Sequence, residues 1–325
     1  MPGQAEEIES SMRAVFHYAC SQVLEQRLAA LAPPWLDIQS CPESDDERLF
    51  RLLPEAEVLL HVLKPATAAL MNAAPRLRLI QKIGVGVNTI DLQHAERCGI
   101  PVCNMPGTNS RAVAEATLLL MLTVLRRARS LDTATRAGEG WRLDPALFDR
   151  VGEIGGRTVG FVGYGAVPVL LAPVLIALGA RVLYTATAPK VDPGAEWREL
   201  PELLAQADIV SLHLPLTAET EGIIDAAAIA RMKRGALLIN TARGGLVDEP
   251  ALVAALRDGR LRGAGLDVYA EEPLRGDSPL MEMNNVVLLP HVAWLTPETL
   301  ARSFAVAVEN CRRLRDGEAL LHRVA

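Results

Sequence analysis

Residues 158–168 have the sequence TVGFVGYGAVP, an apolar run followed by a glycine-rich turn. The run predicts a buried β-strand, and the apolar residues after the turn predict a helix. Gly163-x-Gly165-x-x-Pro168 has the spacing of a dinucleotide-binding fingerprint, with proline in place of the third glycine. Gly163 permits the tight turn, Gly165 lets the backbone approach a pyrophosphate, and the helix N-terminus offers free N–H groups to it. Proline is tolerated in the first helical turn, where its missing N–H costs no hydrogen bond.

Short apolar runs separated by helical patterns continue on both sides of this turn. Downstream, ARVLYT, ADIVSLHLP, ALLINTA, RGAGLDVYA and NVVLLP complete six predicted strands with RTVGFVG. Upstream, MRAVFHY, EVLLHVL, LRLIQKI and PVCN predict a smaller open sheet. Because helical segments of crossover length lie between the runs, we expect both sheets to be parallel. The sequence therefore predicts an α/β protein with two doubly wound parallel-sheet domains.

The chain is expected to pass between these two domains twice. A long helical pattern over residues 109–130 connects the blocks, and its apolar part, Ala112–Leu125, suits either a subunit interface or an ordinary core position. The last helix, about Pro297–Asp316, has no strand after it and could pack back on the first block. We therefore expect residues 108–290 to form a Rossmann nucleotide-binding domain. Residues 1–107 and 291–325 are expected to form a flavodoxin-like substrate domain around it.

The composition excludes several classes of protein. The 325 residues include 33 Lys and Arg against 39 Asp and Glu, a net charge of −6, so no overall charge attracts nucleic acid or an anionic membrane. No apolar run reaches the roughly 18 residues of a membrane-spanning helix, and the acidic opening MPGQAEEIESSM differs from a secretory signal. The five cysteines are scattered without metal-ligand spacing. These features favour a cytoplasmic protein with reduced thiols and no metal site.

The end of the strand ARVLYT bears on which dinucleotide binds. An acidic residue there usually binds the adenosine ribose hydroxyls, but the segment from Tyr184 to Lys190, YTATAPK, contains none. The hydroxyls of Thr185 and Thr187 and the ammonium of Lys190 could instead receive a 2′-phosphate. The segment therefore favours NADP as the cofactor. NAD stays open, because the segment has no arginine to bind the phosphate in two places.

Three polar side chains follow three predicted strands of the second block. Arg243 comes after ALLINTA, Glu272 after AGLDVYA, and His291 directly after VVLLP. The carboxyl ends of parallel strands share one edge of the sheet, so we expect the three near the glycine turn. Reduction of a 2-oxo acid needs a cation for the carboxylate and a proton for the carbonyl oxygen. Arg243 can bind the carboxylate, and His291, oriented by Glu272, can donate the proton.

Several longer stretches resemble a known family. They are ADIVSLHLPLTAET, MKRGALLINTARGGLVDEPALVAAL, GAGLDVYAEEP and LLPHVAW, with KIGVGVNTIDL and NMPGTNSRAVAE earlier. Together they resemble the D-isomer-specific 2-hydroxyacid dehydrogenases, from about Ile80 to the C-terminus. The resemblance implies a nucleotide domain inserted into a substrate domain, dimerisation through the nucleotide domain, and a catalytic set that falls on Arg243, Glu272 and His291.

The resemblance also implies binding residues. The backbone of Val85 and Gly86 would bind the substrate carboxylate together with Arg243. Trp294 completes an HxAW pattern similar to that of glycerate dehydrogenases, and would either narrow the substrate pocket or cover the domain interface. Ala166 and Pro168 depart from an arginine and a glycine common in the family. The residues expected to bind the cofactor are Thr108, Gly163, Tyr164, Gly165, Ala166, Val167, Thr185, Thr187, Lys190, His213, Pro215, Thr220, Thr241, Ala242 and Asp267.

These features lead to one hypothesis and two alternatives. The chain is expected to be an NAD(P)-dependent D-2-hydroxyacid dehydrogenase that reduces glyoxylate, hydroxypyruvate or a similar small 2-oxo acid. The resemblance of LYTATAPK to segments of NADPH-linked glyoxylate/hydroxypyruvate reductases supports this hypothesis. A non-catalytic nucleotide-sensing protein, similar to the corepressors of the same fold, is the first alternative. Oxidation of phosphite or formate is the second, although formate enzymes typically carry glutamine where this chain has Pro290.

Overall fold

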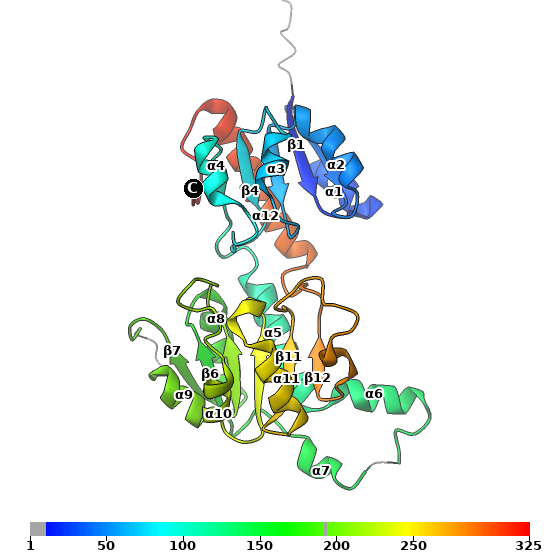
Figure 1. Ribbon diagram of the computed structural model, residues 1–325, viewed down its shortest axis with the longest axis vertical. Helices are drawn as coiled ribbons and strands as arrows, with labels where there is room; N and C mark the ends of the chain where they lie inside the picture. The colour runs from blue at the N-terminus through cyan, green and yellow to red at the C-terminus, as the bar shows by residue number, and fades with distance from the viewer. Residues whose placement is uncertain (1–10, 143, 192–193) are drawn as a thin grey trace, which may run out of the picture. The chain divides into compact units, whose positions relative to one another are not determined.

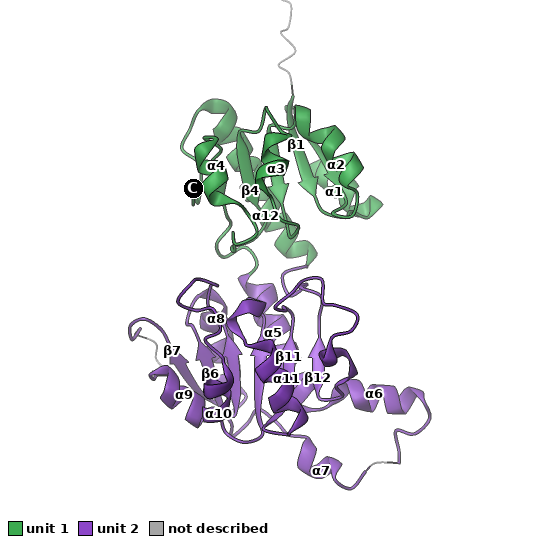
Figure 2. Ribbon diagram, in the orientation of Figure 1, with its two compact units in different colours: residues 1–109, 296–325 green, residues 110–295 purple. Residues whose placement is uncertain are grey.

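The computed structural model describes residues 11–142, 144–191 and 194–325 (Figure 1). Figure 2 shows its two compact units: unit 1 is Met1–Asn109 with Thr296–Ala325, and unit 2 is Ser110–Leu295. The boundaries differ from the expected residues 107 and 290, so His291 belongs to unit 2 and not to the other unit. The reason is that Asp267 of unit 2 binds the backbone of the turn that follows Pro290.

The sheet of unit 1 is parallel, with strand order β2-β1-β3-β4-β5. This is the order of flavodoxin, and it confirms the predicted fold class for the first block. The prediction missed β2, because the middle of this edge strand is the polar sequence DIQS. The strands are β1 (Met12–His17), β2 (Leu36–Cys41), β3 (Val58–His61), β4 (Leu79–Lys82) and β5 (Val102–Cys103).

The C-terminal helix α12 (Pro297–Asp316) packs within unit 1. Phe304 on α12 meets Phe16 of β1 edge to face, with ring centroids 5.1 Å apart, and Asn310 donates a 2.6 Å hydrogen bond to the side chain of Gln81 on β4. The predicted return of the last helix to the first block is thereby confirmed. The other helices of unit 1 are α1 (Gln22–Leu31), α2 (Asp46–Leu52), η1 (Leu53–Glu55), α3 (Ala68–Asn72) and α4 (Leu92–Arg97).

The sheet of unit 2 is also parallel, with strand order β12-β11-β10-β9-β6-β7-β8. The six predicted strands are all present, with one additional edge strand, which confirms the doubly wound arrangement. The prediction missed β8, a strand of only three residues at the edge of the sheet. The strands are β6 (Thr158–Val162), β7 (Arg181–Thr185), β8 (Ala195–Trp197), β9 (Ile209–Leu212), β10 (Ala236–Asn240), β11 (Leu261–Leu266) and β12 (Val286–Leu288).

The single helix predicted over residues 109–130 is wrong. Helix α5 (Ser110–Leu125) ends before Arg127, which has a left-handed backbone (φ 51°), and α6 (Ala128–Arg136) starts after it. Nine residues of α5 are buried, so α5 is mainly a core helix. The remaining helices of unit 2 are α7 (Leu147–Arg150), α8 (Ala166–Ala177), α9 (Leu200–Gln206), α10 (Ala226–Arg231), η2 (Gly244–Leu246), α11 (Glu249–Arg257) and η3 (Pro279–Glu282).

Two further features bear on the class of protein. Among the described residues, none of the helices combines the length and apolar character needed to cross a membrane. In the same part of the chain, no three His, Cys, Asp or Glu side chains come together as metal ligands, and the five cysteines are free thiols.

Candidate active site

The carboxyl ends of the unit 2 strands bring the expected site residues to one edge of the sheet. Strands β6 and β9 pair with each other, and the chain adds later strands in opposite directions from them: β7 and β8 beyond β6, and β10 to β12 beyond β9. Ligands of open α/β sheets bind at such a switch point. The glycine turn follows β6, Arg243 follows β10, Glu272 follows β11 and His291 follows β12.

The glycine turn has the shape that a pyrophosphate needs. Gly163 has φ 94°, and an added Cβ would lie 2.5 Å from the carbonyl oxygen of His213, so glycine is required there. Gly165 caps helix α8, and an added Cβ would meet nothing within 4 Å. The start of α8 is therefore open on the side where a Gly165 side chain would lie. Pro168 is the third residue of α8 and costs no hydrogen bond, because the first four helical N–H groups have no intrahelical acceptor.

The loop after β7 folds back on this turn. The ammonium of Lys190 donates a 2.7 Å hydrogen bond to the carbonyl oxygen of Tyr164, between the two glycines. The buried hydroxyl of Tyr184 donates to the Lys190 carbonyl (2.7 Å) and accepts from the Lys190 N–H (2.6 Å). Thr185 is half-buried and Thr187 is exposed. The structure thus brings one of the predicted phosphate ligands, Lys190, to the dinucleotide turn and holds its backbone.

His291 and Glu272 form a close pair. Nδ1 of His291 lies 2.6 Å from Oε2 of Glu272, and Oε1 of Glu272 accepts a 3.0 Å hydrogen bond from the Tyr269 N–H. Burial would raise the pKa of Glu272, but the hydrogen bond and charge of His291, with help from Arg243, hold it below its ordinary value. Glu272 is therefore a carboxylate that fixes the imidazole ring. The other ring nitrogen, Nε2, is left to exchange a proton.

The backbone of His291 is held by Asp267, a role that the sequence did not indicate. Its backbone has φ 56°, an unusual conformation for a residue with a side chain. The Asp267 carbonyl accepts the His291 N–H (2.8 Å), and the two carboxylate oxygens accept the N–H groups of Val292 (2.8 Å) and Ala293 (3.0 Å). Trp294 donates its indole N–H to the His291 carbonyl (3.0 Å) and is buried. Both side chains thus position His291.

Arg243 extends from a tightly packed backbone. Asn240 donates to the Arg243 carbonyl (2.8 Å) and accepts from the Ala242 N–H (3.0 Å), which fixes the turn after β10. Gly244 lies so close to the Tyr269 backbone that a Cβ would collide with it, so this turn and the end of β11 are packed together. Burial lowers the pKa of Arg243 and the charge of Glu272 opposes this shift. The guanidinium keeps its charge at neutral pH, since arginine does not lose its proton in proteins.

The other expected cofactor residues of unit 2 lie at the same edge or stabilise it. Nε2 of His213 is 2.9 Å from the Ser211 hydroxyl, and burial lowers the pKa of His213 to about 3, so the ring is neutral. Thr220 donates to the Pro215 carbonyl (2.7 Å). Thr241 is buried, with its hydroxyl 2.9 Å from that of Thr117 on α5.

Three of the expected residues lie in unit 1. Val85, with 45% of its surface exposed, and Gly86 follow β4 in a loop that Asn104 holds through a 2.9 Å hydrogen bond to the Val85 carbonyl. Thr108 contacts α12 through Ser303 and Arg302. The structure therefore groups Arg243, Glu272, His291 and the glycine turn in unit 2, and Val85, Gly86 and Thr108 in unit 1.

Comparisons with known proteins identify the family of this chain. The family model for the NAD-binding domain of the D-isomer-specific 2-hydroxyacid dehydrogenases matches residues 118–293. The chain belongs to this family. It is 42% identical to a glyoxylate reductase of Aeropyrum pernix, over 77% of this chain and 76% of that protein. It is 38% identical to a D-3-phosphoglycerate dehydrogenase of Mycobacterium leprae over 91% of this chain, but spans only 56% of that longer protein.

A solved structure is similar over nearly the whole length of this dehydrogenase. It is an NADPH-dependent glyoxylate/hydroxypyruvate reductase from Sinorhizobium meliloti in complex with NADP and malonate, with a TM-score of 0.82, 28% identity, and 97% coverage of both chains. The predicted family and enzyme class are thus confirmed: the dehydrogenase is an oxidoreductase for 2-hydroxy acids with a nicotinamide cofactor.

Proposed function

We propose that this dehydrogenase reduces a small 2-oxo acid such as glyoxylate or hydroxypyruvate, with Arg243, Glu272 and His291 as its catalytic residues. The observation that carries the proposal is the 2.6 Å pair of His291 and Glu272 at the strand edge that also bears Arg243 and the glycine turn. The names of the glyoxylate reductase and glyoxylate/hydroxypyruvate reductase relatives support the substrate class.

Each residue has a separate task in this mechanism. The Arg243 guanidinium binds the substrate carboxylate and the adjacent carbonyl oxygen, because its planar fork matches two oxygens side by side. Nε2 of His291 donates the proton that the carbonyl oxygen needs, and Glu272 stabilises the ring in its protonated form before transfer. The reduced nicotinamide supplies the hydride when it is bound. We propose in addition that the backbone N–H groups of Val85 and Gly86 take part in substrate binding.

The same proposal names NADP as the preferred cofactor. The support is the position of the Lys190 ammonium 2.7 Å from the Tyr164 carbonyl, together with the lack of any acid from Tyr184 to Lys190. A 2′-phosphate would find a cation there, and no carboxylate of that segment would repel it. Thr185 and Thr187 would add hydroxyl donors. The pyrophosphate would lie over Gly163 and Gly165, against the N-terminus of α8.

We also propose that the enzyme is a homodimer formed through unit 2. Figure 1 shows α6 and α7 on a stretch of chain that projects from the body of this unit. On this stretch, Trp141 and Phe148 are 86% and 92% exposed. Leu119 and Leu122 of α5 are exposed as well, although the rest of α5 is core. Burying such large apolar side chains against a second copy would stabilise the pair by about 2–3 kcal/mol each.

The test is the initial rate of NADPH or NADH oxidation with glyoxylate and with hydroxypyruvate. We expect turnover with both acids, faster with NADPH, and none above background in His291→Ala. Turnover that favours NADH would overturn the cofactor assignment and keep the enzyme. A lack of turnover with either acid and either cofactor would contradict the proposed substrate class.

A further inference from the structure

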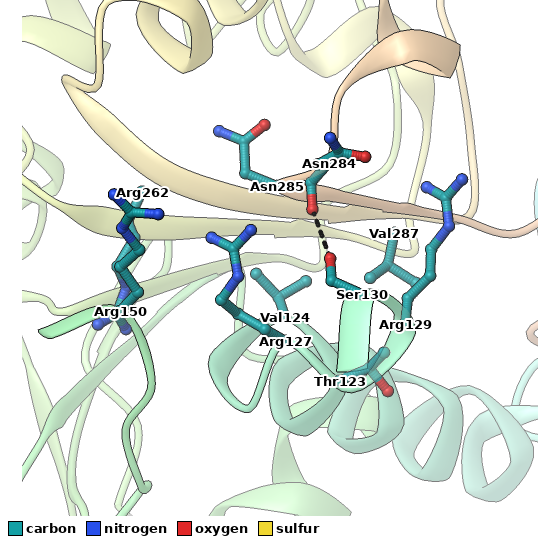
Figure 3. Close-up of a pocket in the computed structure, with 10 residues that line it drawn as sticks. All are labelled: Thr123, Val124, Arg127, Arg129, Ser130, Arg150, Arg262, Asn284, Asn285 and Val287. Atoms are coloured by element: carbon teal, nitrogen blue, oxygen red, sulfur yellow. Dashed lines mark hydrogen bonds between the residues drawn. The ribbon is translucent and has the colours of Figure 1, made fainter. Parts of the chain in front are cut away.

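Unit 2 has a second charged pocket that the proposed reaction does not use. Figure 3 shows the residues that line it. Arg262 lies near the start of β11 and Asn285 directly before β12, so the pocket is at the amino ends of these strands, the opposite edge of the sheet from His291. Its walls come from the end of α5, the start of α6, α7, β11 and the loop before β12. Among the described residues that line it are four arginines, Arg127, Arg129, Arg150 and Arg262, and no carboxylate.

The fold brings these arginines together from distant parts of the chain. Arg127 lies at the break between α5 and α6, where its backbone is left-handed (φ 51°). Arg262 is the second residue of β11, and Arg150 is the last residue of α7. Asn284 forms the opposite wall, where its carbonyl accepts a 3.4 Å hydrogen bond from Ser130 (Figure 3). The pocket is therefore built by the tertiary fold and not by one basic run.

Protein carboxylates neutralise little of this positive charge. Arg150 pairs with Asp144 at 3.4 Å, but both side chains are more than half exposed, so the pair is weak. Within the described residues, neither Arg127 nor Arg262 forms an ion pair. Burial, with the nearby charge of Arg157, lowers the pKa of Arg262. Asp208 opposes this shift, but its carboxylate already binds Lys233 (3.0 Å) and the Thr158 N–H (2.8 Å). Arg262 is thus half-buried beside another positive charge, that of Arg157.

We propose that this pocket binds a small anion that carries a phosphate group, with Arg127 and Arg262 as its main ligands and Arg150 at the rim. A phosphate offers several oxygens to the planar forks of two arginines, and it would offset the repulsion among the guanidinium groups. Arg129 is partly engaged, since it donates to the Val286 carbonyl (3.3 Å). This proposal does not depend on the substrate or cofactor proposed above. It is also separate from the proposed dimer contact, because none of the exposed apolar residues assigned to that contact lines the pocket.

The test is calorimetric titration with inorganic pyrophosphate of the enzyme saturated with whichever of NADPH and NADH it binds more tightly, because the bound nucleotide occupies the glycine turn. We expect one further site, and Arg127→Gln and Arg262→Gln should each weaken it about tenfold, the effect of losing a charge-assisted hydrogen bond. Arg136→Gln is the matched control, because Arg136 lies on α6 outside the pocket and pairs with Asp132. If Arg262→Gln does not fold, Arg127→Gln carries the test alone.

Three results would overturn the proposal. Pyrophosphate could bind Arg127→Gln as tightly as the unchanged enzyme, which would place the anion elsewhere. Alternatively, the arginine variants could change the sedimentation of the protein while leaving pyrophosphate affinity intact, which would make the pocket a contact between subunits. If pyrophosphate does not bind but citrate does, and citrate binding depends on Arg127, the ligand does not carry a phosphate group.

Discussion

Both parallel sheets carry histidines where the carboxyl ends of their strands meet, but those of unit 1 are buried and His291 of unit 2 is partly exposed. In unit 2, His291 and Glu272 form a pair with 21% and 32% of their side chains exposed. In unit 1, His17, His61 and Lys82 occupy neighbouring register positions on β1, β3 and β4, and all three are buried. Within the described residues, neither ring nitrogen of His17 nor Nδ1 of His61 has a hydrogen-bond partner. Equivalent positions in two sheets thus give different chemistry.

Burial and pairing explain the difference. Burial lowers the pKa of His17 and of His61, and the charge of Lys82 lowers that of His61 further. Both rings are neutral near pH 7, and an unpaired buried nitrogen costs about 1–3 kcal/mol of stability. His291, in contrast, has a carboxylate partner and contact with solvent. We expect the unit 2 edge to exchange protons during turnover and the unit 1 edge to resist protonation.

The largest expected effect is on turnover. His291→Asn should lower kcat by about 10²–10⁴-fold, because it removes the proposed general acid and keeps a polar side chain. The measurement is the steady-state rate of NADPH oxidation with glyoxylate. His94→Asn on α4, where the partly exposed ring lies 2.9 Å from the Asn72 side chain in unit 1, is the control and should keep the rate. If His61→Gln folds normally but loses kcat to a comparable extent, the contrast between the two sheets is wrong, because the buried histidines of unit 1 would then also take part in proton transfer.

The second effect is on stability in acid. Unfolding exposes His17 and His61, which then bind protons with an ordinary pKa near 6.5, whereas the folded unit binds them only at lower pH. The unfolded state therefore holds more protons below pH 6.5, and unit 1 loses up to about 1.4 kcal/mol per histidine for each pH unit. Above pH 6.5 neither histidine contributes a pH dependence.

Hydrogen exchange of the β1 and β3 amides at pH 7.5 and 5.5, corrected for intrinsic rates, measures this loss. The double variant His17→Leu and His61→Leu should remove most of the pH dependence from these strands. The strands of unit 2 serve as the internal reference. Buried His213 gives them a pH dependence of their own, which should be the same in the unchanged enzyme and in the double variant. An unchanged pH dependence of β1 and β3 in the double variant would contradict the prediction.

The two edges also differ in how well the sequence predicts them. The location of Arg243, Glu272 and His291 at one edge could be predicted because each follows a predicted strand, and parallel strands bring their carboxyl ends to one edge whatever the details of packing. The burial of His17 and His61 could not, because chain order does not reveal what covers a strand end. The same limit applies to Asp267, whose position in GLDVY does not show that its carboxylate binds the turn after Pro290.

Short and irregular elements set the limits of the fold prediction. The strands with long apolar runs are confirmed, whereas β2 and β8 are edge strands with polar or few residues. The break between α5 and α6 depends on the left-handed backbone of Arg127, a residue that propensity would leave inside a helix. Tertiary contacts of this kind override the local pattern.

The third effect is on cofactor selectivity. Tyr184→Phe removes the hydroxyl that binds both backbone groups of Lys190, so we expect the dissociation constant of NADPH to rise about five- to tenfold. That of NADH should change little. Fluorescence titration of both nucleotides measures the two constants. Lys190→Ala should have a similar effect, and the double variant should be no weaker than Lys190→Ala alone if Tyr184 acts through Lys190. Equal losses for both nucleotides would reject the assigned role.

The smallest expected effect concerns how firmly the backbone of His291 is held. Trp294→Phe keeps an aromatic ring but removes the N–H that binds the His291 carbonyl, and a hydrogen bond of this kind is worth about 1 kcal/mol. We expect kcat to fall about two- to fivefold while KM for glyoxylate stays constant, because the left-handed His291 backbone loses one of its supports. Trp35→Phe is the control, since Trp35 lies in unit 1 with the Arg315 guanidinium over its ring and, among the described residues, touches none of those assigned to substrate or cofactor. Equal losses of kcat in both variants would mean that general stability, and not the position of His291, limits the rate. A loss in Trp294→Phe alone would show that proton transfer by His291 depends on the buried hydrogen bond from Trp294 to its carbonyl.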